Sequence, residues 1–553
     1  MRRARTIATL LVLGGLARGR DSEAQVPRIE SRAESSGYEE TSRYADVVRF
    51  IDDIRRIDPS VRVETFGRSA EGRDLPLLIL ADPPASTPVE ARRSGKPVVF
   101  VMANIHAGEV EGKEAVLHLA RRIAAGDLRP LLARMTILIA PIYNADGNEA
   151  ISPLNRPEQN GPVAGVGHRE NAGGLDLNRD FMKLESPEAR ALVRLMGRWD
   201  PHLTIDLHTT NGSYHGYHLT YSIPLNPAGD PRIAAFERDR MMPAIGRAML
   251  DQHRLRTYYY GNFAESNPNT RQPEPRSWQA FTHLPRIGQN YVGLRNRLAI
   301  LSEAYSYLDF RARIAATEAF VEEILRYVAD RGPEVVRLTE EADDDATRRG
   351  QAASPGSLGV EFAMTPLPAP VEILVGEVRQ VANPRSGLVR SVMVEDRVTP
   401  VRMLDYGQFA ATQSVARPFA YLVRPDEDLS PVRDLLMRHG IVIEELTGPL
   451  RAEVEVFDVT EVRRSPRPSQ GHREVRLSGR SRRETAEFPA RTILVRSSQP
   501  LATLASYLLE PESDDGLVTW NVLDARLAPG KSVPVSKLMG VVIVPTRIIP
   551  PDR

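Results

Sequence analysis

The sequence has no cysteine, and this absence narrows the chemistry open to the chain. None of the 553 residues is Cys, which excludes disulfide bonds, thiol nucleophiles and thiolate metal ligands. A transition metal could be bound only through His and carboxylate side chains. The search for a metal or catalytic site is therefore a search for these residue types.

A net charge and long hydrophobic runs are also missing. The 72 basic residues balance 72 acidic residues, whereas nucleic-acid binders carry a net basic surface, so we expect no nucleic-acid partner. After the first 24 residues no apolar run is long enough to cross a bilayer, and we expect no membrane span. What is present, 42% apolar residues in a chain of 553, suffices for two globular domains.

Residues 1–24 have the pattern of a signal peptide. Basic residues at positions 2, 3 and 5 precede an apolar run over residues 6–17, which is too short for a membrane helix. The pattern predicts a signal peptide over 1–24, a linker over 25–40 and a secreted or periplasmic protein. A disordered leader or a misassigned start is the alternative, and the cleavage site is ambiguous between Ala17 and Ala24.

Residues 41–335 have the pattern of an α/β domain. Short apolar runs, typical of buried strands, occupy residues 77–81, 98–103, 136–140, 203–207 and 298–301. Helical spacing is found at residues 42–58, 116–123 and 314–329, and Ser186, Pro187 and Glu188 supply the start signals of another helix. We predict a mixed sheet flanked by helices, with chemistry at the strand ends.

A second, mostly β accessory domain is predicted over residues 369–553. Residues 340–359 are acidic and then rich in Gly, Ser, Pro and Ala, which predicts a linker over 336–368. Beyond it, alternating stretches such as 454–459 and 492–496 are separated by turn signals, with one helix near 431–439. The acidic residues at 510, 512, 514 and 515 are expected in a hydrated loop, with a calcium site as the alternative.

Metal-ligand residues follow two of the predicted strands. His106 and Glu109 lie three residues apart after the strand at 98–103, and His208 follows the strand at 203–207. Two imidazoles and one carboxylate leave a fourth position open for water, as catalytic zinc requires. We predict that these three residues bind one Zn²⁺ per chain; a coincidence of polar strand ends is the structural alternative.

Two more segments carry candidate catalytic residues. The apolar run 298–301 leads to Glu303, whose neighbours are expected to be buried, and a charge there costs energy unless it has a partner or a task. The polar loop 168–181 contains Arg169 and Arg179, whose side chains are suited to bidentate binding of anions. Salt bridges are the alternative role for the two arginines.

In their order along residues 44–329, these motifs resemble those of the zinc carboxypeptidase family, to which pancreatic carboxypeptidase A belongs. The resemblance is to a bacterial member with an extra C-terminal domain. The resemblance implies that His106, Glu109 and His208 hold zinc and that Glu303 is the general base. It further implies that Asn178 and Arg179 bind the terminal carboxylate of the substrate.

Other roles implied by the resemblance are less closely tied to the motifs. Arg169, nine residues before Asn178 as in the family's cytosolic relatives, is expected to stabilise the oxyanion and is preferred to Arg156. Arg73 resembles the arginine of an outer substrate subsite, and Tyr291 is a candidate for the family's flexible phenol. Asp180 departs from the family pattern, since many members carry an amide or another polar residue at this position. Its charge could partly neutralise Arg179 and weaken selection for a free C-terminus.

The function predicted from the sequence is that of a zinc metallocarboxypeptidase acting on a peptide or peptide-like substrate. One alternative keeps the zinc but acts as an amidohydrolase or deacylase on small acylated amino acids or cell-wall peptides. Another is a non-catalytic zinc-containing binding protein; the presence of Glu303 beside three ligands argues against it, because structural zinc sites close their fourth position. The pattern does not indicate an oligomeric state.

Overall fold

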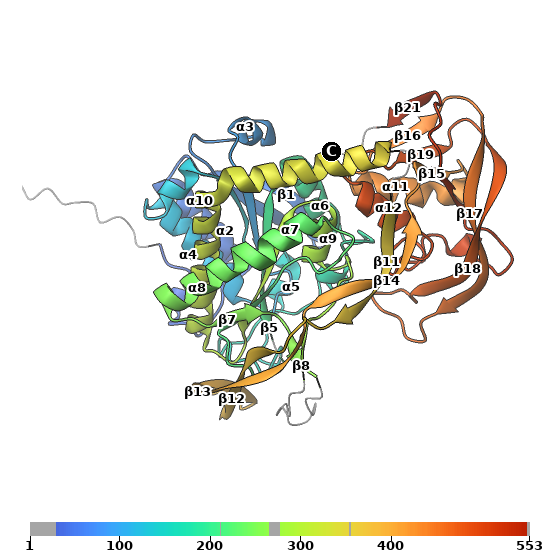
Figure 1. Cartoon of the computed structure of the whole chain (residues 1–553). Helices are drawn as coiled ribbons and strands as arrows, with labels where there is room; N and C mark the ends of the chain where they lie inside the picture. Colours follow the sequence, from blue (N-terminus) through green and yellow to red (C-terminus); the bar gives the residue numbers. More distant parts are fainter. Residues whose placement is uncertain (1–28, 211, 265–276, 353–355, 550–553) are drawn as a thin grey trace, which may run out of the picture.

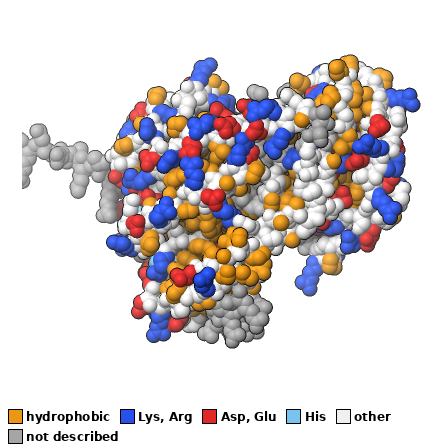
Figure 2. Space-filling model, viewed as in Figure 1, with side chains coloured by type: hydrophobic (Ala, Val, Ile, Leu, Met, Phe, Trp, Pro, Cys, Tyr) orange, Lys and Arg blue, Asp and Glu red, His pale blue; other side chains and the backbone are white. Residues whose placement is uncertain are grey.

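The computed structural model describes residues 29–549 apart from 211, 265–276 and 353–355, and the expected signal peptide lies outside them. The described chain forms two lobes that lie side by side (Figure 1). Basic and acidic side chains are interspersed over the face shown in Figure 2, in line with the balanced composition. Within the described residues, no helix has both the length and the apolar character needed to cross a membrane.

The N-terminal lobe is built on an eight-stranded mixed sheet, which confirms the predicted fold class. The strand order is β1-β2-β4-β3-β5-β10-β6-β7. The pairs β3–β4, β3–β5, β5–β10 and β6–β7 are parallel, and the other pairs are antiparallel. In order across the sheet, the strands are β1 (Arg62–Arg68), β2 (Asp74–Leu80), β4 (Thr136–Ala140), β3 (Val98–Ala103), β5 (Leu203–Thr210), β10 (Leu298–Tyr305), β6 (Leu219–Ser222) and β7 (Thr257–Tyr259).

Helices cover this sheet where the sequence pattern predicts them. Ser186 caps α6 by accepting a hydrogen bond from the backbone N–H of Ala189 at 3.0 Å, and Pro187 occupies the first turn. The longer helices are α2 (Tyr44–Ile57), α4 (Glu111–Ala124), α6 (Pro187–Trp199), α8 (Met242–His253), α9 (Gly288–Leu294) and α10 (Phe310–Gln351). Shorter elements are α1 (Arg32–Ser35), α3 (Pro88–Arg93), α5 (Ala145–Glu149), α7 (Pro231–Phe236), β8 (Asn262–Phe263) and β9 (Ser277–Gln279).

The prediction of a linker over residues 336–368 is wrong for most of this segment. Helix α10 continues without a break to Gln351 and joins the two lobes (Figure 1), and β11 (Ser357–Thr365) follows it. Buried residues at 335, 339, 342, 346 and 350 recur at helical spacing. Gly350 lies so close to the C-terminal lobe that a Cβ would stand 2.0 Å from the carbonyl oxygen of Ser497. The polar composition of this segment therefore belongs to a helix with one narrow buried face.

The C-terminal lobe is mostly β, as predicted. Its seven-stranded sheet has the order β18-β17-β20-β15-β19-β16-β21. These strands are β15 (Ala420–Val423), β16 (Ile443–Leu446), β17 (Leu450–Arg464), β18 (Val475–Phe488), β19 (Ile493–Arg496), β20 (Val535–Leu538) and β21 (Thr546–Ile549); the helices are α11 (Ser430–Arg438) and α12 (Ala502–Leu509).

The boundary of the accessory domain differs from the one predicted at residue 369. The hairpin of β12 (Val371–Ala382) and β13 (Val389–Tyr406) returns to the N-terminal lobe, where β13 pairs with β9 in a four-stranded sheet. The strands β11 and β14 (Gln408–Ala416) form a separate ribbon. Residues 371–406 therefore belong structurally to the N-terminal lobe.

The two lobes share one hydrophobic core. A single cluster of buried apolar side chains contains Leu192 and Val335 of the N-terminal lobe together with Tyr421 and Leu508 of the C-terminal lobe. The acidic group at 510–515 lies beside this core, and each of its carboxylates contacts another side chain, which for Glu512 is that of Gln413. These contacts correct both the hydrated-loop and the calcium interpretations. Its ion pairs are Glu510 with Lys537, Asp514 with His283, and Asp515 with Arg286.

The expected linker over 25–40 is also a packed segment in its described part. Glu34 in α1 forms a bidentate pair with Arg121, with Nη1 and Nη2 at 2.7 and 2.9 Å from its carboxylate oxygens. It also lies 3.3 Å from Nε2 of His118, whose Nδ1 lies 3.6 Å from Glu318. Burial lowers the pKa of His118, but these two carboxylates outweigh it and raise the pKa to about 9.

This arrangement predicts a pH-dependent stability. Because the folded-state pKa of His118 is raised from 6.5 to about 9, its contribution is fully present below pH 6.5 and is lost as the pH rises through 9. The contribution amounts to about 3 kcal/mol of unfolding free energy. Urea unfolding at pH 6 and pH 9.5 should show a smaller alkaline loss of stability for His118→Gln than for the wild type.

The comparison between the two proteins removes an opposing contribution. Burial lowers the pKa of Lys113 to about 8, so its contribution to stability grows with pH over an overlapping range. Lys113 is unchanged in both proteins, and its effect cancels in the difference. Equal pH slopes for the wild type and His118→Gln would contradict the assignment.

Candidate metal centre and active site

Three adjacent parallel strands deliver the candidate site residues to one edge of the sheet. His106 and Glu109 lie in the loop that joins β3 to α4, while His208 lies within β5 and Glu303 within β10. The last two strands extend further than the sequence predicted, and His208 is paired in register with Glu303. After β3 the chain passes to β4 on one side and then to β5 on the other, so the site lies where the strand order reverses.

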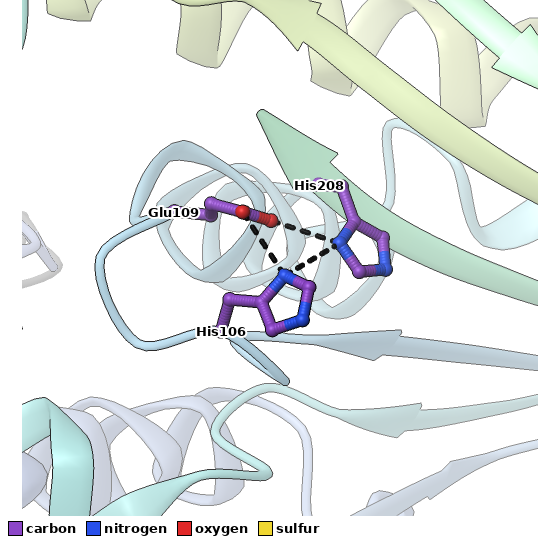
Figure 3. Close-up of side chains that lie close together, drawn as sticks. All are labelled: His106, Glu109 and His208. Carbon is purple, nitrogen blue, oxygen red and sulfur yellow. Dashed lines mark hydrogen bonds and ion pairs between the residues drawn. The ribbon is translucent and has the colours of Figure 1, made fainter. Parts of the chain in front are cut away.

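The three predicted metal ligands converge. One ligand atom from each of His106, Glu109 and His208 lies within 4.8 Å of the others, and the two imidazoles and the carboxylate point toward one another (Figure 3). Nδ1 of His208 lies 3.2 Å from Nδ1 of His106 and 2.8 Å from Oε2 of Glu109. Nδ1 of His106 lies 3.0 Å from Oε1 of Glu109. All three side chains are buried.

Two carboxylates that the sequence analysis did not single out orient the imidazoles. Nε2 of His106 lies 3.1 Å from Oδ1 of Asp176, and Nε2 of His208 lies 2.9 Å from Oδ2 of Asp206. In the tautomers that donate from Nε2, both Nδ1 lone pairs face the centre of the cluster. The spacing of Asp206, two residues before His208 on one face of a strand, is the only sequence signal that could have identified it.

The convergence of these electron-rich atoms fits a bound cation. Burial raises the pKa of Glu109, but His106, Arg156 and His208 outweigh it and hold the pKa well below its usual range. Burial lowers the pKa of His208, but Asp206 and Glu109 outweigh it and raise the pKa well above the ordinary value. Two imidazole nitrogens and one carboxylate, each imidazole held by a further carboxylate, form the donor set of a catalytic zinc site.

Glu303 lies beside this cluster and has one unpaired oxygen. Its side chain is half-buried, and Oε2 is inaccessible and has no hydrogen-bond partner among the described residues. Burial raises the pKa of Glu303 to about 8, and the nearby Glu109 carboxylate adds to this effect. A divalent cation nearby would lower this pKa again. Burial and a bound cation would therefore shift the pKa of this carboxyl group in opposite directions.

The two candidate arginines contact the cluster in different ways. Arg156 donates from Nη2 to Oε1 of Glu109 at 2.6 Å. Arg169 donates from Nε and Nη2 to Oδ2 of Asp176 at 3.0 and 2.8 Å, and its Nη1 lies 3.3 Å from Nδ1 of His106. Arg156 thus orients a ligand, whereas the partly exposed Arg169 presents Nη1 to the cluster.

Asn178 and Arg179 extend the site from Asp176. The amide Nδ2 of Asn178 lies 3.5 Å from Nε2 of His208, and its Oδ1 accepts a hydrogen bond from the backbone N–H of Gly288 at 2.9 Å. Arg179 donates to the carbonyl oxygen of Asn178 at 2.8 Å and packs over the ring of Phe281 at 5.3 Å. Among the described residues, the guanidinium group of Arg179 forms an ion pair only with Asp176, at 3.9 Å.

Asp180 does not neutralise Arg179 as the sequence suggested. Asp180 is completely buried and pairs with Lys183 at 2.7 Å. It also accepts backbone hydrogen bonds from Glu185 at 3.0 Å and Ser186 at 2.7 Å. These contacts use both carboxylate oxygens to shape the turn before α6, and the positive charge of Arg179 is left for another anion.

Two expected substrate-binding residues are bonded to other side chains. Arg73 pairs with Glu71 and, at 2.6 Å, with Asp146. Tyr291 is completely buried, and its hydroxyl lies 2.9 Å from Nδ1 of His439 in the C-terminal lobe. We therefore correct the expectation for Tyr291, because a phenol packed between the lobes is not placed to contact a substrate.

A different tyrosine lies near the proposed base. Tyr260, which follows β7, is hydrogen bonded to Asn262 at 3.4 Å. Burial raises its pKa, and so does the charge of Glu303. The sequence could not have identified it, because Tyr258, Tyr259 and Tyr260 are consecutive and only the fold distinguishes them.

Sequence comparison relates part of this chain to a known family. Residues 47–283 match the model of the zinc carboxypeptidase family. The chain is 24% identical over 504 residues to carboxypeptidase 2 of Trichophyton equinum, covering 85% of this chain and 81% of that protein. It is 27% identical over 224 residues to human carboxypeptidase Z, covering 35% of this chain and 33% of that protein. Glu303 lies beyond the segment that matches the family model.

Among solved structures, the chain is similar to a metallo-carboxypeptidase from Burkholderia cenocepacia. The identity is 21%, the TM-score is 0.38, and the match covers 52% of this chain and 69% of that one. The fold described above therefore rests on the strands and helices of this chain itself.

The contact between Asp206 and His208 predicts a measurable effect on metal binding. Asp206→Asn keeps the size of the side chain but removes the charge that orients and polarises the imidazole. We expect the affinity for Zn²⁺ to fall about 10-fold to 100-fold, measured by competition with a chelator. Asp251→Asn, on the exposed face of α8, is the matched control. Wild-type affinity in Asp206→Asn would contradict this role.

Proposed function

The chain carries a zinc carboxypeptidase family domain over residues 47–283 and is a metallocarboxypeptidase, and from this premise we propose that it removes C-terminal residues from peptides with one zinc ion. The observation that carries the proposal is the convergence of His106, Glu109 and His208 within 4.8 Å. Glu303, in register beside His208, supplies the fourth element of the site.

His106, Glu109 and His208 would hold the zinc, and Asp176 and Asp206 would fix the two imidazoles. When bound, zinc supplies a Lewis acid that polarises a carbonyl group and lowers the pKa of water. The chain itself supplies rigidity, because all five side chains are buried and each is hydrogen bonded. A preorganised donor set of this kind minimises reorganisation during turnover.

Glu303 would act as the general base and then as the general acid. Its unpaired Oε2 is the atom proposed to accept a proton from the attacking water. The same oxygen would deliver the proton to the nitrogen of the leaving amine as the peptide bond breaks. Burial raises the pKa of Glu303 and favours the protonated form that delivers the proton. A bound divalent cation would lower the pKa and favour the carboxylate that accepts the proton.

Arg169 would face the negative charge that develops on the carbonyl oxygen. Asp176 holds its Nε and Nη2 and thereby leaves Nη1 directed at the ligand cluster. Removal of one such donor typically lowers turnover by about 100-fold to 1,000-fold. Arg156, which donates to Glu109, is proposed as a support for the metal ligand.

Asn178 and Arg179 would bind the C-terminal carboxylate of the substrate. The pairing of Asp180 with Lys183 supports this role, because it leaves the charge of Arg179 uncancelled on that side. Arg73, at the rim near Asp146, is proposed to contact residues further along the peptide. A bidentate guanidinium group discriminates strongly in favour of a carboxylate.

Substitution of the proposed base separates catalysis from metal binding. Glu303→Gln keeps the shape of the side chain but cannot accept the proton, so we expect kcat to fall about 100-fold to 10,000-fold. Zinc content, measured by elemental analysis of the same samples, should equal that of the wild type. Glu341→Gln, on the exposed face of α10, is the matched control. Equal turnover would remove Glu303 from the mechanism.

Blocking the substrate terminus distinguishes a carboxypeptidase from a deacylase acting on acylated amino acids or from an endopeptidase. A charge-assisted hydrogen bond contributes about 1.5–3 kcal/mol, so amidation of the C-terminus should lower kcat/KM for a peptide about 10-fold to 100-fold. In Arg179→Gln, free and amidated peptides should be cleaved at similar rates. If the wild type cleaves both peptides equally, Arg179 does not bind the terminal carboxylate.

A further inference from the structure

The turn between β17 and β18 reaches the active-site rim from the C-terminal lobe. This hairpin tip, defined here as residues 465–474, ends in a tight turn in which Ser469 and His472 exchange backbone hydrogen bonds. At its apex the side-chain Oε1 of Gln470 accepts a hydrogen bond from the backbone N–H of Asp176 at 2.9 Å. Asp176 is the residue that holds both His106 and Arg169.

The contact does not stand alone, because the C-terminal lobe holds the segment 176–185 at several points. His472 of the hairpin tip lies 2.7 Å from Oε1 of Glu185. The imidazole of His439 donates from Nε2 to the carbonyl oxygen of Met182 at 3.1 Å. The ammonium group of Lys183 lies 5.7 Å from the ring centroid of Trp520. The segment that carries Asp176, Asn178 and Arg179 is thus docked on the other lobe along its length.

A second set of contacts connects the C-terminal lobe to Asn178. Arg286 donates from its backbone N–H and from Nε to Asp515 of the C-terminal lobe, at 2.7 and 2.9 Å, and pairs with Glu474 of the hairpin tip at 2.6 Å. Two residues later, the backbone N–H of Gly288 donates to Oδ1 of Asn178. Arg286 and Asp515 are buried and Glu474 is partly buried, so the pair of Arg286 with Glu474 holds the hairpin tip against the N-terminal lobe.

The backbone conformation of Gln470 is unfavourable for a residue with a long side chain. Its φ is +51°, in the left-handed region that Gly or Asn adopts at lower cost than a long side chain. The next residue, Gly471, also has a positive φ of +81°. A turn chosen for stability alone would place Gly or Asn at position 470, whereas the amide of Gln is long enough to reach Asp176. Strain at a residue that contacts a functional segment indicates a constraint from function.

We propose that Gln470 is a positioning residue for the active site and that the C-terminal lobe thereby completes the site. The amide of Gln470 fixes the peptide group of Asp176. Through Asp176 it sets the orientation of His106 toward the metal and of Arg169 toward the substrate. It also fixes the start of the segment that presents Asn178 and Arg179. This inference rests on the proposed zinc site and gives the second lobe a part in it.

Three variants in the full chain test this role. Gln470→Met keeps the length of the side chain but has no strong acceptor, and Gln470→Gly removes the side chain and relieves the positive φ. Gln470→Glu keeps an oxygen acceptor at the same reach. Ser469→Ala is the matched control on the same turn, because the side chain of Ser469 is exposed and makes no hydrogen bond among the described residues.

Zinc affinity and peptide hydrolysis should change together while stability does not. We expect Gln470→Met and Gln470→Gly to bind Zn²⁺ about threefold to tenfold more weakly in chelator competition, less than for direct removal of an imidazole partner. KM for peptides with a free C-terminus should rise about tenfold. The melting temperature of the metal-free Gln470→Gly protein should stay within about 2 °C of the wild type. Gln470→Glu should restore both zinc affinity and KM.

Two results would overturn the proposal. One is wild-type zinc affinity and KM in both Gln470→Met and Gln470→Gly, which would make the hairpin contact incidental. The other is failure of Gln470→Glu to restore either quantity, which would mean that the acceptor atom is not what matters. Failure of the proposed function itself is recognised separately, because then the wild-type protein would neither bind Zn²⁺ nor hydrolyse the peptide.

Discussion

The parallel pairing of β3, β5 and β10 is the constraint on which the site depends. Hydrogen-bonded neighbours in a parallel pair end at the same edge of the sheet, so ligands far apart in sequence are brought together by the backbone. The register places Glu303 directly beside His208. A slip of one residue in β10 would turn Glu303 to the opposite face of the sheet. The loops contribute residues to the site, but the sheet decides where those residues meet.

Negatively and positively charged side chains are interspersed around the proposed metal ligands. Carboxylates at 109, 176, 206 and 303 lie among the guanidinium groups at 156, 169 and 179, and the closest pairs are at 2.6 and 2.8 Å. Buried charges are tolerated only when each has a partner. Because every carboxylate except Glu303 is held by an imidazole or an arginine, the proposed base is the one whose protonation is free to change.

The sequence was sufficient where local signals and the strand ends coincide. β3 and β4 match their predicted bounds, and the side chains of the three predicted metal ligands lie close together, since each follows an apolar strand or lies near its end. The prediction failed where long-range packing decides the outcome. The polar composition of residues 336–351 gave no sign of a helix with a narrow buried face, and Gln470 gains its proposed role only from a partner on another element. Asp206 contacts His208 because both side chains lie on one face of β5. Tyr291 was misplaced because its spacing from Glu303 says nothing about the lobe that covers it.

Helix α10 has a mechanical consequence for the whole molecule. It runs for 42 residues from the N-terminal lobe to the C-terminal lobe, where it packs on α12, and the lobes share one apolar core. Domain closure around a ligand requires a few residues that can act as a hinge, whereas the described part of this junction is one helix that lies over a core shared by both lobes. We therefore expect the two lobes to move as one body, rather than to open and close independently around a peptide.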